Sequence, residues 1–356
     1  MSERRITISA SNLVLTVAVG LLMVLLWQLR SLLVVLMISI VLASTLAPVI
    51  ESAQKLKIPR WLAVIGVYLG LIATFSLMII VIGPAVVEQI QRLLRKLPSY
   101  LNVLETLIDS LVIRLGMTET TLSDFFDTQT LTSWLFRSSQ QLLVRSYGVT
   151  RGILGGVFTL ILAVLLSGYM LSGSSSLIQG IVSLFPQPWD QRLREQVQPV
   201  SKRMGGYIQG RVLVSAILAV AINIGLRILG ISEFALGLGV IAGVTNLIPF
   251  FGPVLGAIPA LIVAVSFGGW TFLWVLLLFV VLQNVETYVL DPLLVGNSVK
   301  VSPLYQLLAV LGGVQVLGIL GAIIVPPWVA GVGVVLDNLY LKPKQEAEKV
   351  ADIAHG

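Results

Sequence analysis

The chain of 356 residues has no cysteine and only one histidine, His355. Without cysteine it can form no disulfide, no iron–sulfur cluster and no thiolate metal site. Charged residues are scarce as well: they make up 11% of the sequence, whereas hydrophobic residues make up 56%. Soluble domains carry about 25% charged residues, so this composition excludes that class and indicates an integral membrane protein.

The motifs of several common enzyme classes are also missing. The sequence contains no H-E-x-x-H zinc motif, no paired intramembrane aspartates and no G-x-x-x-x-G-K-[ST] phosphate loop. We therefore expect no enzyme, no catalytic residue, no cofactor and no metal site. Lysine and arginine outnumber the acidic residues by 23 to 17, but they lie mostly in short loops between apolar runs, so nucleic acid is not an expected partner.

Eight apolar runs approach or exceed the ~20 residues that a helix needs to cross a bilayer. They cover residues 13–27, 32–50, 61–83, 153–171, 212–229, 234–267, 270–290 and 303–336. Lipid cannot satisfy free backbone groups, and the runs do not alternate as barrel strands would. The predicted fold class is therefore an all-α integral membrane protein.

The basic residues indicate the orientation of the spans, because short cytoplasmic loops carry an excess of lysine and arginine. They gather in four groups: Arg4 and Arg5; Lys55, Lys57 and Arg60; Arg192, Arg194, Lys202 and Arg203; and Lys342, Lys344 and Lys349. Both termini are accordingly predicted to be cytoplasmic.

The order of the apolar runs and the predicted sides of their loops divide the chain into four parts. Residues 1–83 are expected to form three N-terminal transmembrane helices. Residues 84–150 are expected to form an extracytoplasmic insertion of amphipathic helices, because its apolar residues recur at helical spacing. Residues 151–340 form a second membrane half with transporter-like features, and 341–356 a polar cytoplasmic tail.

Two segments, 234–267 and 303–336, are longer than a tilted helix needs for a core of about 30 Å, and each is interrupted near its middle. The first contains Pro249 and Pro253, which lack a backbone donor. The interruptions in the second are Gly312, Gly313 and the pair that begins at Pro326. Each segment could be one broken helix or a hairpin that turns back inside the protein.

Irregular backbone at membrane depth survives only where protein or a water-filled cavity satisfies it, so the two breaks are candidates to line a transport pathway. Asn246 can supply polar contacts beside the first break, and Gly252 and Gly256 let other backbones approach. In this interpretation the two breaks face each other around a cavity. The alternative is that the prolines only kink packed helices.

Polar residues near the end of the run 270–290 are further pathway candidates, because polar groups inside a membrane are costly. Helical spacing places them on two adjoining stripes, one with Gln283, Glu286 and Thr287 and one with Asn284, Thr287 and Asp291. Arg211 or Arg227 could pair with Glu286 across the bundle. Alternatively, Arg211, Arg227 and Asp291 extend to the membrane interface from near the ends of their spans.

Four stretches of the second half resemble the autoinducer-2 exporter (AI-2E) family of multi-pass bacterial permeases. They are GYIQGR (206–211), LGISEFALGLGVIAGVTNLIPFFGPVLGAIPA (229–260), LQNVETYVLDPLLVGNSVKVSPLYQLLAVLGG (282–313) and LGILGAIIVPPWVA (317–330). Their order and spacing match over roughly residues 150–336, whereas the first half matches only in its layout of spans. Where the family usually has Gly-Gln after its tyrosine, this chain has arginine at the glutamine position, Arg211.

The resemblance implies a transporter of the bacterial inner membrane that forms homo-oligomers. Some members of the family are associated with export of the furanone autoinducer-2, and others with sodium or lithium/proton antiport. The leading hypothesis is secondary transport of a small molecule or ion, driven without ATP, with Glu286 or Asp291 exchanging protons. Cation/proton antiport and a non-transporting membrane scaffold or regulator are the alternatives.

Overall fold

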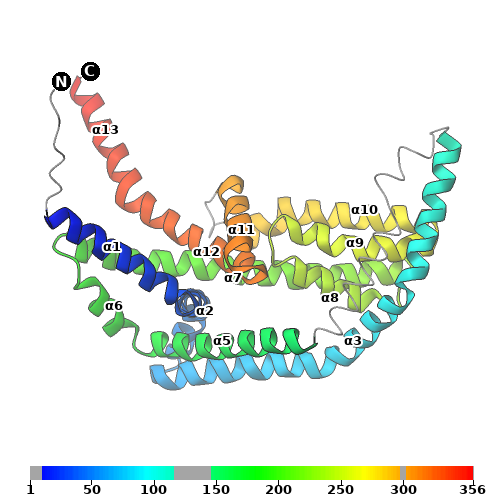
Figure 1. Cartoon of the computed structure of the whole chain (residues 1–356), viewed down its shortest axis with the longest axis horizontal. Coiled ribbons are helices and arrows are strands. Elements are labelled where there is room, and N and C mark those ends of the chain that lie inside the picture. Colours follow the sequence, from blue (N-terminus) through cyan, green and yellow to red (C-terminus); the bar gives the residue numbers. More distant parts are fainter. Residues whose placement is uncertain (1–9, 116–145, 297–301, 356) are drawn as a thin grey trace.

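The computed structural model describes residues 10–115, 146–296 and 302–355, and throughout these ranges it contains helices and no strands. Most of the long helices run along the long axis of the molecule (Figure 1). Within the described ranges, five helices are long and apolar enough to cross a membrane: Arg30–Gln54, Arg60–Leu104, Trp189–Ile228, Gly269–Val295 and Ile319–Lys349. A sixth span results if Gly156–Ser172 and Ser174–Val182 are counted together. The predicted all-α membrane fold is therefore confirmed.

The N-terminal part consists of α1 (Ala10–Gln28), α2 (Arg30–Gln54) and α3 (Arg60–Leu115). Helix α3 is continuous over 56 residues and passes through Pro84 and Pro98. The boundary predicted at residues 83 and 84 thus lies inside one helix. Residues 84–115 are helical, whereas 116–145 of the predicted insertion lie outside the described residues.

Next along the chain come α5 (Ser146–Ser172), α6 (Ser174–Val182) and α7 (Trp189–Ile228). Helix α5 packs on α2 and α3. Helix α7 has 40 residues and is the central element, because α2, α8, α10 and α12 all pack on it. Gly205 allows this close packing, since a Cβ atom there would collide with the carbonyl group of Ser44 in α2.

The first over-long segment is a hairpin of α8 (Ala235–Thr245) and α9 (Phe251–Ser266). The two helices are antiparallel, because Gly252 lies against Thr245 whereas Gly256, one turn further along α9, lies against Ala242, one turn earlier in α8. The chain reverses at Phe250, whose φ of 65° lies in the left-handed region. Pro253 falls in the first turn of α9, where its missing N–H removes no helical hydrogen bond.

The second over-long segment also forms a hairpin, after α10 (Gly269–Val285) and the π-helix η1 (Glu286–Val295). It consists of α11 (Pro303–Leu317) and α12 (Ile319–Leu336), which reverse at Gly318 with a φ of 63°. Gly313 and Gly321 let the two backbones touch. The π-helix η2 (Asp337–Leu341) and α13 (Lys342–His355) follow. For each of the two over-long segments, the sequence left open a broken helix or a hairpin, and in the structure both segments are hairpins.

The two hairpins pack on different parts of α7. Gly237, Gly239 and Gly243 mark the packing face of α8, and the last two contact α7 near Ala219. In the second hairpin, Gly331 of α12 contacts Met204 of α7. Within the described part of the chain no extensive contact joins one hairpin to the other. The predicted arrangement, in which the two breaks face each other, is therefore not observed.

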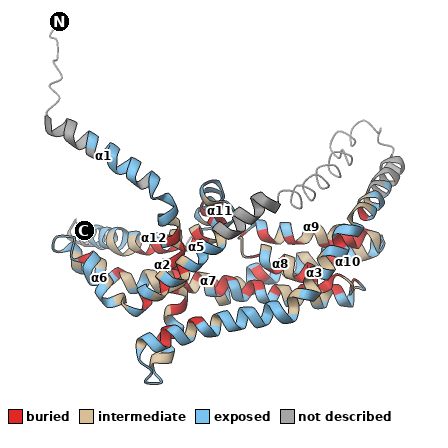
Figure 2. Cartoon of the chain, turned by 60° about the horizontal axis from the view of Figure 1, so that its bottom comes forward, coloured by how far each residue is buried: buried red, intermediate tan, exposed pale blue. Residues whose placement is uncertain are grey.

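The buried residues form separate clusters along α7, one with α3, α8, α9 and α10 and another with α2, α5 and α12. Much of α3 is exposed (Figure 2). Many exposed side chains are large and apolar, such as Leu77, Ile80 and Val81 of α3. Contiguous apolar surface of this kind is expected where a protein faces lipid.

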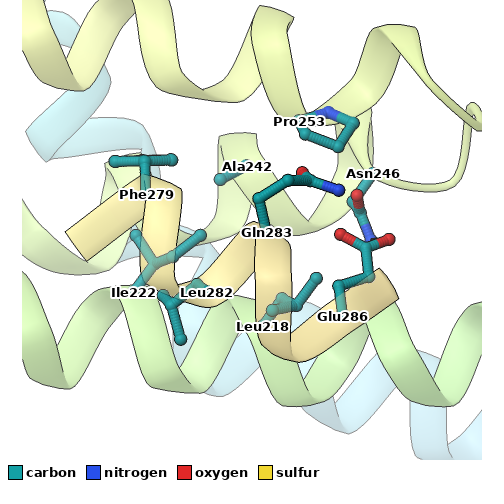
Figure 3. A pocket seen from close by; sticks show the side chains of 9 residues that line it. All are labelled: Leu218, Ile222, Ala242, Asn246, Pro253, Phe279, Leu282, Gln283 and Glu286. Carbon is teal, nitrogen blue, oxygen red and sulfur yellow. The ribbon is translucent and has the colours of Figure 1, made fainter. Parts of the chain in front are cut away.

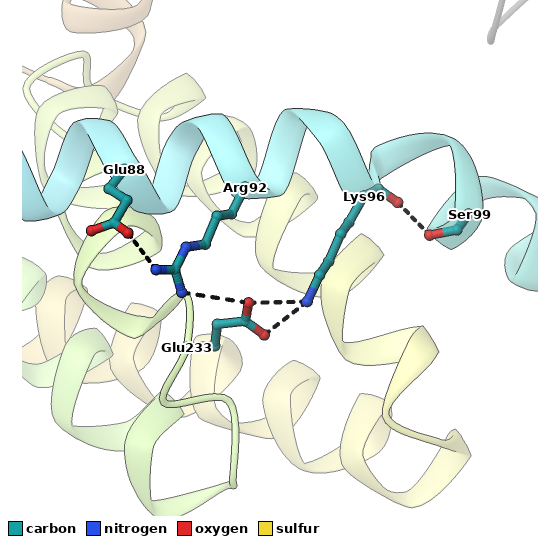
Figure 4. Close-up of polar contacts among 5 residues, drawn as sticks. All are labelled: Glu88, Arg92, Lys96, Ser99 and Glu233. Carbon is teal, nitrogen blue, oxygen red and sulfur yellow. Dashed lines mark hydrogen bonds and ion pairs between the residues drawn. The ribbon is translucent and has the colours of Figure 1, made fainter.

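The distal part of α3 lies against the first hairpin. Lys96 pairs with Glu233 in the turn before α8, with its Nζ 3.0 Å from the carboxylate, and Arg92 bonds to Glu88 (Figure 4). The Oε1 of Gln89 accepts a hydrogen bond of 2.8 Å from the backbone N–H of Gly237. The C-terminal part of α3 is therefore attached to the hairpin of α8 and α9 by these polar contacts.

Candidate functional site

A buried group of polar side chains lies where α7, the first hairpin and η1 meet. The Nη1 atom of Arg211 lies 2.8 Å from Oε1 of Glu286 and 3.5 Å from Oδ1 of Asp291. Asn246 donates a hydrogen bond of 3.1 Å from Nδ2 to the same Oε1 of Glu286. Arg211, Asn246 and Glu286 are 5%, 2% and 2% exposed, so this ion pair is shielded from solvent.

Local backbone features bring these side chains together. Asn246 caps the C-terminal end of α8, directly before the chain reverses into α9. Glu286 begins η1, and a hydrogen bond of 2.6 Å from the N–H of Gly296 to the carbonyl of Asp291 shows the i to i−5 pattern of a π-helix. Short π-helical segments occur frequently at functional sites.

Close packing of α7 on η1 sets the distance across the ion pair. A Cβ atom at Gly210 would collide with the carbonyl of Leu294 in η1. Because Gly210 has none, α7 approaches η1 at the residue next to Arg211. Gly210 therefore has a direct structural role in placing the guanidinium beside Glu286.

A small pocket of about 20 Å³ adjoins the ion pair, which is about the space that one water molecule requires. Its walls combine apolar and polar side chains from α7, α8, α9, α10 and η1: Leu218, Ile222, Ala242, Asn246, Pro253, Phe279, Leu282, Gln283 and Glu286. Figure 3 shows Asn246 and Glu286 pointing toward one another, with the carboxamide of Gln283 directed toward them.

Four buried polar atoms around this site have no hydrogen-bond partner among the described residues. They are Nε of Arg211, Oγ of Ser215, Oδ1 of Asn246 and Oδ1 of Asp291. Buried polar atoms are nearly always paired, so a cluster of exceptions suits a site that binds a polar ligand or ion. No group of three or more His, Cys, Asp and Glu side chains suited to a metal ion occurs in the described ranges.

The structure brings several of the predicted residues together. Asn246, Pro253, Gln283 and Glu286 line the pocket, and Arg211 and Asp291 adjoin it. Of the two arginines considered as partners of Glu286, it is Arg211 that forms the pair. Arg227 is exposed and donates instead to Asn223.

Other predicted residues lie outside the pocket. Asn284 and Thr287 are on an exposed face of the helix, where Asn284 donates to the carbonyl of Val280. The remaining predicted residues lie in the hairpins: Pro249, Gly252 and Gly256 in the first, and Gly312, Gly313 and Pro326 in the second. Gly252, Gly256 and Gly313 are packed against backbone atoms of the facing segment, whereas Gly312 is exposed. The second hairpin contributes no residue to the pocket.

Two residues of the site do not appear among the sequence candidates. Ser215 is buried one turn after Arg211, and Tyr207 is buried one turn before it. The hydroxyl of Tyr207 accepts a hydrogen bond of 3.2 Å from Gln306, which ties α11 to α7. The i, i+4 spacing of positions 207, 211 and 215 marks one face of α7 and could have identified both residues.

Comparisons with known proteins agree with this architecture. The sequence profile described as AI-2E family transporter matches residues 15–341. Among similar proteins are two candidate transport proteins of Bacillus subtilis, YueF and YrrI. YueF is 28% identical over 285 residues, covering 79% of this chain and 76% of its own. YrrI is 36% identical over 159 residues, or 45% of each chain.

The profile match includes the N-terminal half, in which the sequence alone showed only a similar layout of spans. It covers α2, α3, α5 and both hairpins in one continuous stretch. The described helices, the lipid-facing apolar surface and this match lead to the same conclusion. The chain is a multi-pass membrane protein that belongs to the AI-2E transporter family.

Proposed function

We propose that the protein is a secondary transporter of a small molecule or ion, and that Arg211, Asn246 and Glu286 form the polar centre of its pathway. The observation that supports this most directly is the buried ion pair beside the turn of the hairpin of α8 and α9. Ionised groups inside a membrane are costly and mark ion or substrate pathways. Interrupted helices at membrane depth border such pathways in many transporters.

The charge balance favours a cation or proton as the coupling species. Arg211 carries one positive charge, whereas Glu286 and Asp291 together carry two negative charges when both are ionised. The oxygen atoms without a donor, Oδ1 of Asn246 and Oδ1 of Asp291, are acceptors. One further proton or monovalent cation would balance the charge of the three side chains. The proton would give these oxygen atoms a hydrogen-bond donor, and the cation could be coordinated by them. Glu286, with Asp291 beside it, is the proposed exchange site.

The geometry also supports a way of releasing Glu286 from its ion pair with Arg211. The Nη1 atom of Arg211 is only 0.7 Å farther from Asp291 than from Glu286, given the distances of 3.5 and 2.8 Å. A small displacement would transfer the guanidinium to Asp291, whose side chain is 40% exposed. Glu286 would then be free to bind the coupling ion while the first hairpin moves against α7.

Autoinducer-2 export is our first proposal for the substrate, by similarity to the family. Sodium or lithium/proton antiport is the second, because the same excess negative charge suits it. We further propose that the protein is a homo-oligomer in the bacterial inner membrane, with both termini cytoplasmic and without enzymatic activity. A non-transporting scaffold or regulator is the rival class.

Flux into proteoliposomes separates these functions. Vesicles with the purified protein are compared with protein-free vesicles for autoinducer-2, sodium and lithium, with and without an imposed pH gradient. We expect flux of at least one solute in excess of empty vesicles. Replacing Glu286→Gln should lower it by about tenfold or more, equivalent to roughly 1.4 kcal/mol.

The matched control is Glu233→Gln, which alters an exposed glutamate of the same chain and should leave flux unchanged. Absence of flux for every solute tested would favour the scaffold. Normal flux in Glu286→Gln would reject Glu286 as the exchange site while leaving a transporter in place.

A further inference from the structure

Helix α6 turns sharply out of the direction of the membrane spans. It is bent by 86° relative to Gly156–Ser172 of α5. Arg60 braces the bend, because its Nε donates to the carbonyl of Leu171 at 2.7 Å and its Nη2 donates to Oγ of Ser174 at 2.8 Å. The apolar run 153–171 predicts that α5 crosses the membrane, and the bend would then direct α6 along the membrane plane.

The side chains of α6 and the following turn form three separate faces. Val182 is buried in the protein. Ile181 and Leu184 lie on a second, exposed face with exposures of 61% and 81%. A third face is polar and includes Ser176 and Gln179. An exposed apolar face opposite a polar one is the pattern of a helix that lies in a membrane interface.

The apolar face continues through the loop after α6 to the first residue of α7. Phe185 and Trp189 are 47% and 46% exposed, so they extend the exposed apolar surface by two aromatic rings. Tryptophan is enriched at the level of the lipid headgroups, where its amphipathic ring is stabilised. The guanidinium of Arg192 lies 5.6 Å from the centre of the Trp189 ring.

Basic residues are frequent in the segments that contact or adjoin this apolar surface, such as Arg60 beside Ser174 and Arg192 beside Trp189. The segments 51–60 and 189–203 contain seven basic and three acidic residues, and 174–188 has no charge at all. Arg192 and Arg194 are exposed, and neither forms an ion pair with a carboxylate in the described ranges. A positive rim of this kind is complementary to anionic phospholipids.

We propose that α6 and its loop form a binding surface for the anionic phospholipid interface, a role separate from transport. Ile181, Leu184, Phe185 and Trp189 insert among the upper acyl chains. Arg192 and Arg194 bind the lipid phosphates, with their aliphatic stems along the apolar surface. The fixed bend at Arg60 holds this surface at the depth of the headgroups.

The absence of cysteine allows a direct test of the depth. Single variants Leu184→Cys and Gln179→Cys carry a spin label, and the full-length protein is placed in phospholipid vesicles. Both positions are exposed, so neither variant removes a buried contact. The label at 184 should be relaxed mainly by oxygen, which partitions into lipid. The label at 179 should be relaxed mainly by a water-soluble nickel complex.

The lipid class is tested with a fluorophore on the Leu184→Cys variant. Quenching by spin-labelled phosphatidylglycerol should exceed quenching by spin-labelled phosphatidylcholine by about twofold or more at equal mole fraction. The double change Arg192→Gln/Arg194→Gln should abolish this preference and leave the depth of the label unchanged.

Three outcomes would overturn the proposal. Equal access of the nickel complex to positions 184 and 179 would place α6 in water. Equal quenching by the two lipids would remove the anionic specificity. Dipolar broadening between labels at 184, together with exclusion of both relaxing agents, would show that a second copy of the chain covers this face.

Discussion

At the scale of single residues, burial distinguishes the Arg211–Glu286 pair from the other ion pairs. Its side chains are 7% and 3% exposed, whereas those of Lys96 and Glu233 are 48% and 36% exposed. Exposed pairs contribute about 0–1 kcal/mol to stability, whereas removing one partner of a buried pair costs about 3–5 kcal/mol. The difference arises because the remaining charge is left in a medium of low polarity.

We therefore predict that Glu286→Gln or Arg211→Gln alone lowers the free energy of unfolding by about 3–5 kcal/mol. The double variant Arg211→Gln/Glu286→Gln should recover most of the loss, because both buried charges are removed and the remaining carboxylate, Asp291, is 40% exposed. Thermal unfolding in detergent measures all three. Lys96→Gln is the control and should cost about 1 kcal/mol or less. Additive losses in the double variant would show that the two residues are not coupled.

A second residue-scale prediction concerns Asn246, whose Nδ2 donates to Glu286. Asn246→Asp would replace this donor with another carboxylate beside Glu286, and like charges at short distance repel each other. We expect flux in proteoliposomes to fall by about tenfold or more.

Asn284→Asp is the matched control for this change. Asn284 is on an exposed face of the adjoining helix and bonds to the backbone of its own turn. Flux should be nearly normal in this variant. Equal losses in the two variants would indicate a general effect of added charge on the membrane helices.

At the scale of elements, two glycines that look alike in the sequence have different roles. Gly256 faces Ala242 across the first hairpin, where a Cβ atom would lie 2.7 Å from a backbone Cα. Gly312, inside α11, has no atom within 4 Å of such a Cβ. One position permits close backbone contact, and the other does not require glycine.

The two alanine variants should therefore shift stability in opposite directions. Gly256→Ala should destabilise by about 1–3 kcal/mol, because overpacking forces the helices apart. Gly312→Ala should be neutral or stabilise by up to about 1 kcal/mol, because glycine is a poor helix former. Thermal unfolding measures both. Similar shifts for the two positions would contradict the hairpin packing.

The sequence could predict where these elements break, but not how the chain continues after each break. Proline and glycine density located both interruptions. A spanning helix and a hairpin place residues 291–302 on opposite sides of the membrane. The charges of Asp291 and Lys300 in this loop nearly balance, so the positive-inside rule favours neither side. Helix α3, by contrast, continues through Pro84 and Pro98 without a break, because a proline within a membrane helix is tolerated when neighbours satisfy the freed carbonyl.

At the scale of the whole molecule, α7 organises the fold and the candidate site. The second hairpin packs near Met204, η1 packs near Gly210, and the first hairpin packs near Ala219. The sequence indicated paired broken segments but placed them around one cavity. Their separation along α7 depends on contacts between residues distant in sequence, such as Gly331 with Met204, which spacing along the chain does not reveal.

The polar centre was more accessible to sequence reasoning than the hairpin arrangement. Charges are rare in this chain, so Arg211, Glu286 and Asp291 stood out within apolar surroundings. The partner of Glu286 was left open between Arg211 and Arg227, because that choice requires the tertiary packing of α7 on η1. The small pocket likewise depends on the fold, since it is built by five elements.

We propose that the pocket beside Glu286 opens in turn to both sides of the membrane. The most direct measurement is the reaction of Gln283→Cys, in this otherwise cysteine-free chain, with a membrane-impermeant thiol reagent added to one side of the vesicles at a time. Leu273→Cys, on an exposed apolar face of the same helix, is the control. Position 283 should react from either side, whereas position 273 should react from neither. Protection of position 283 from both sides would contradict it.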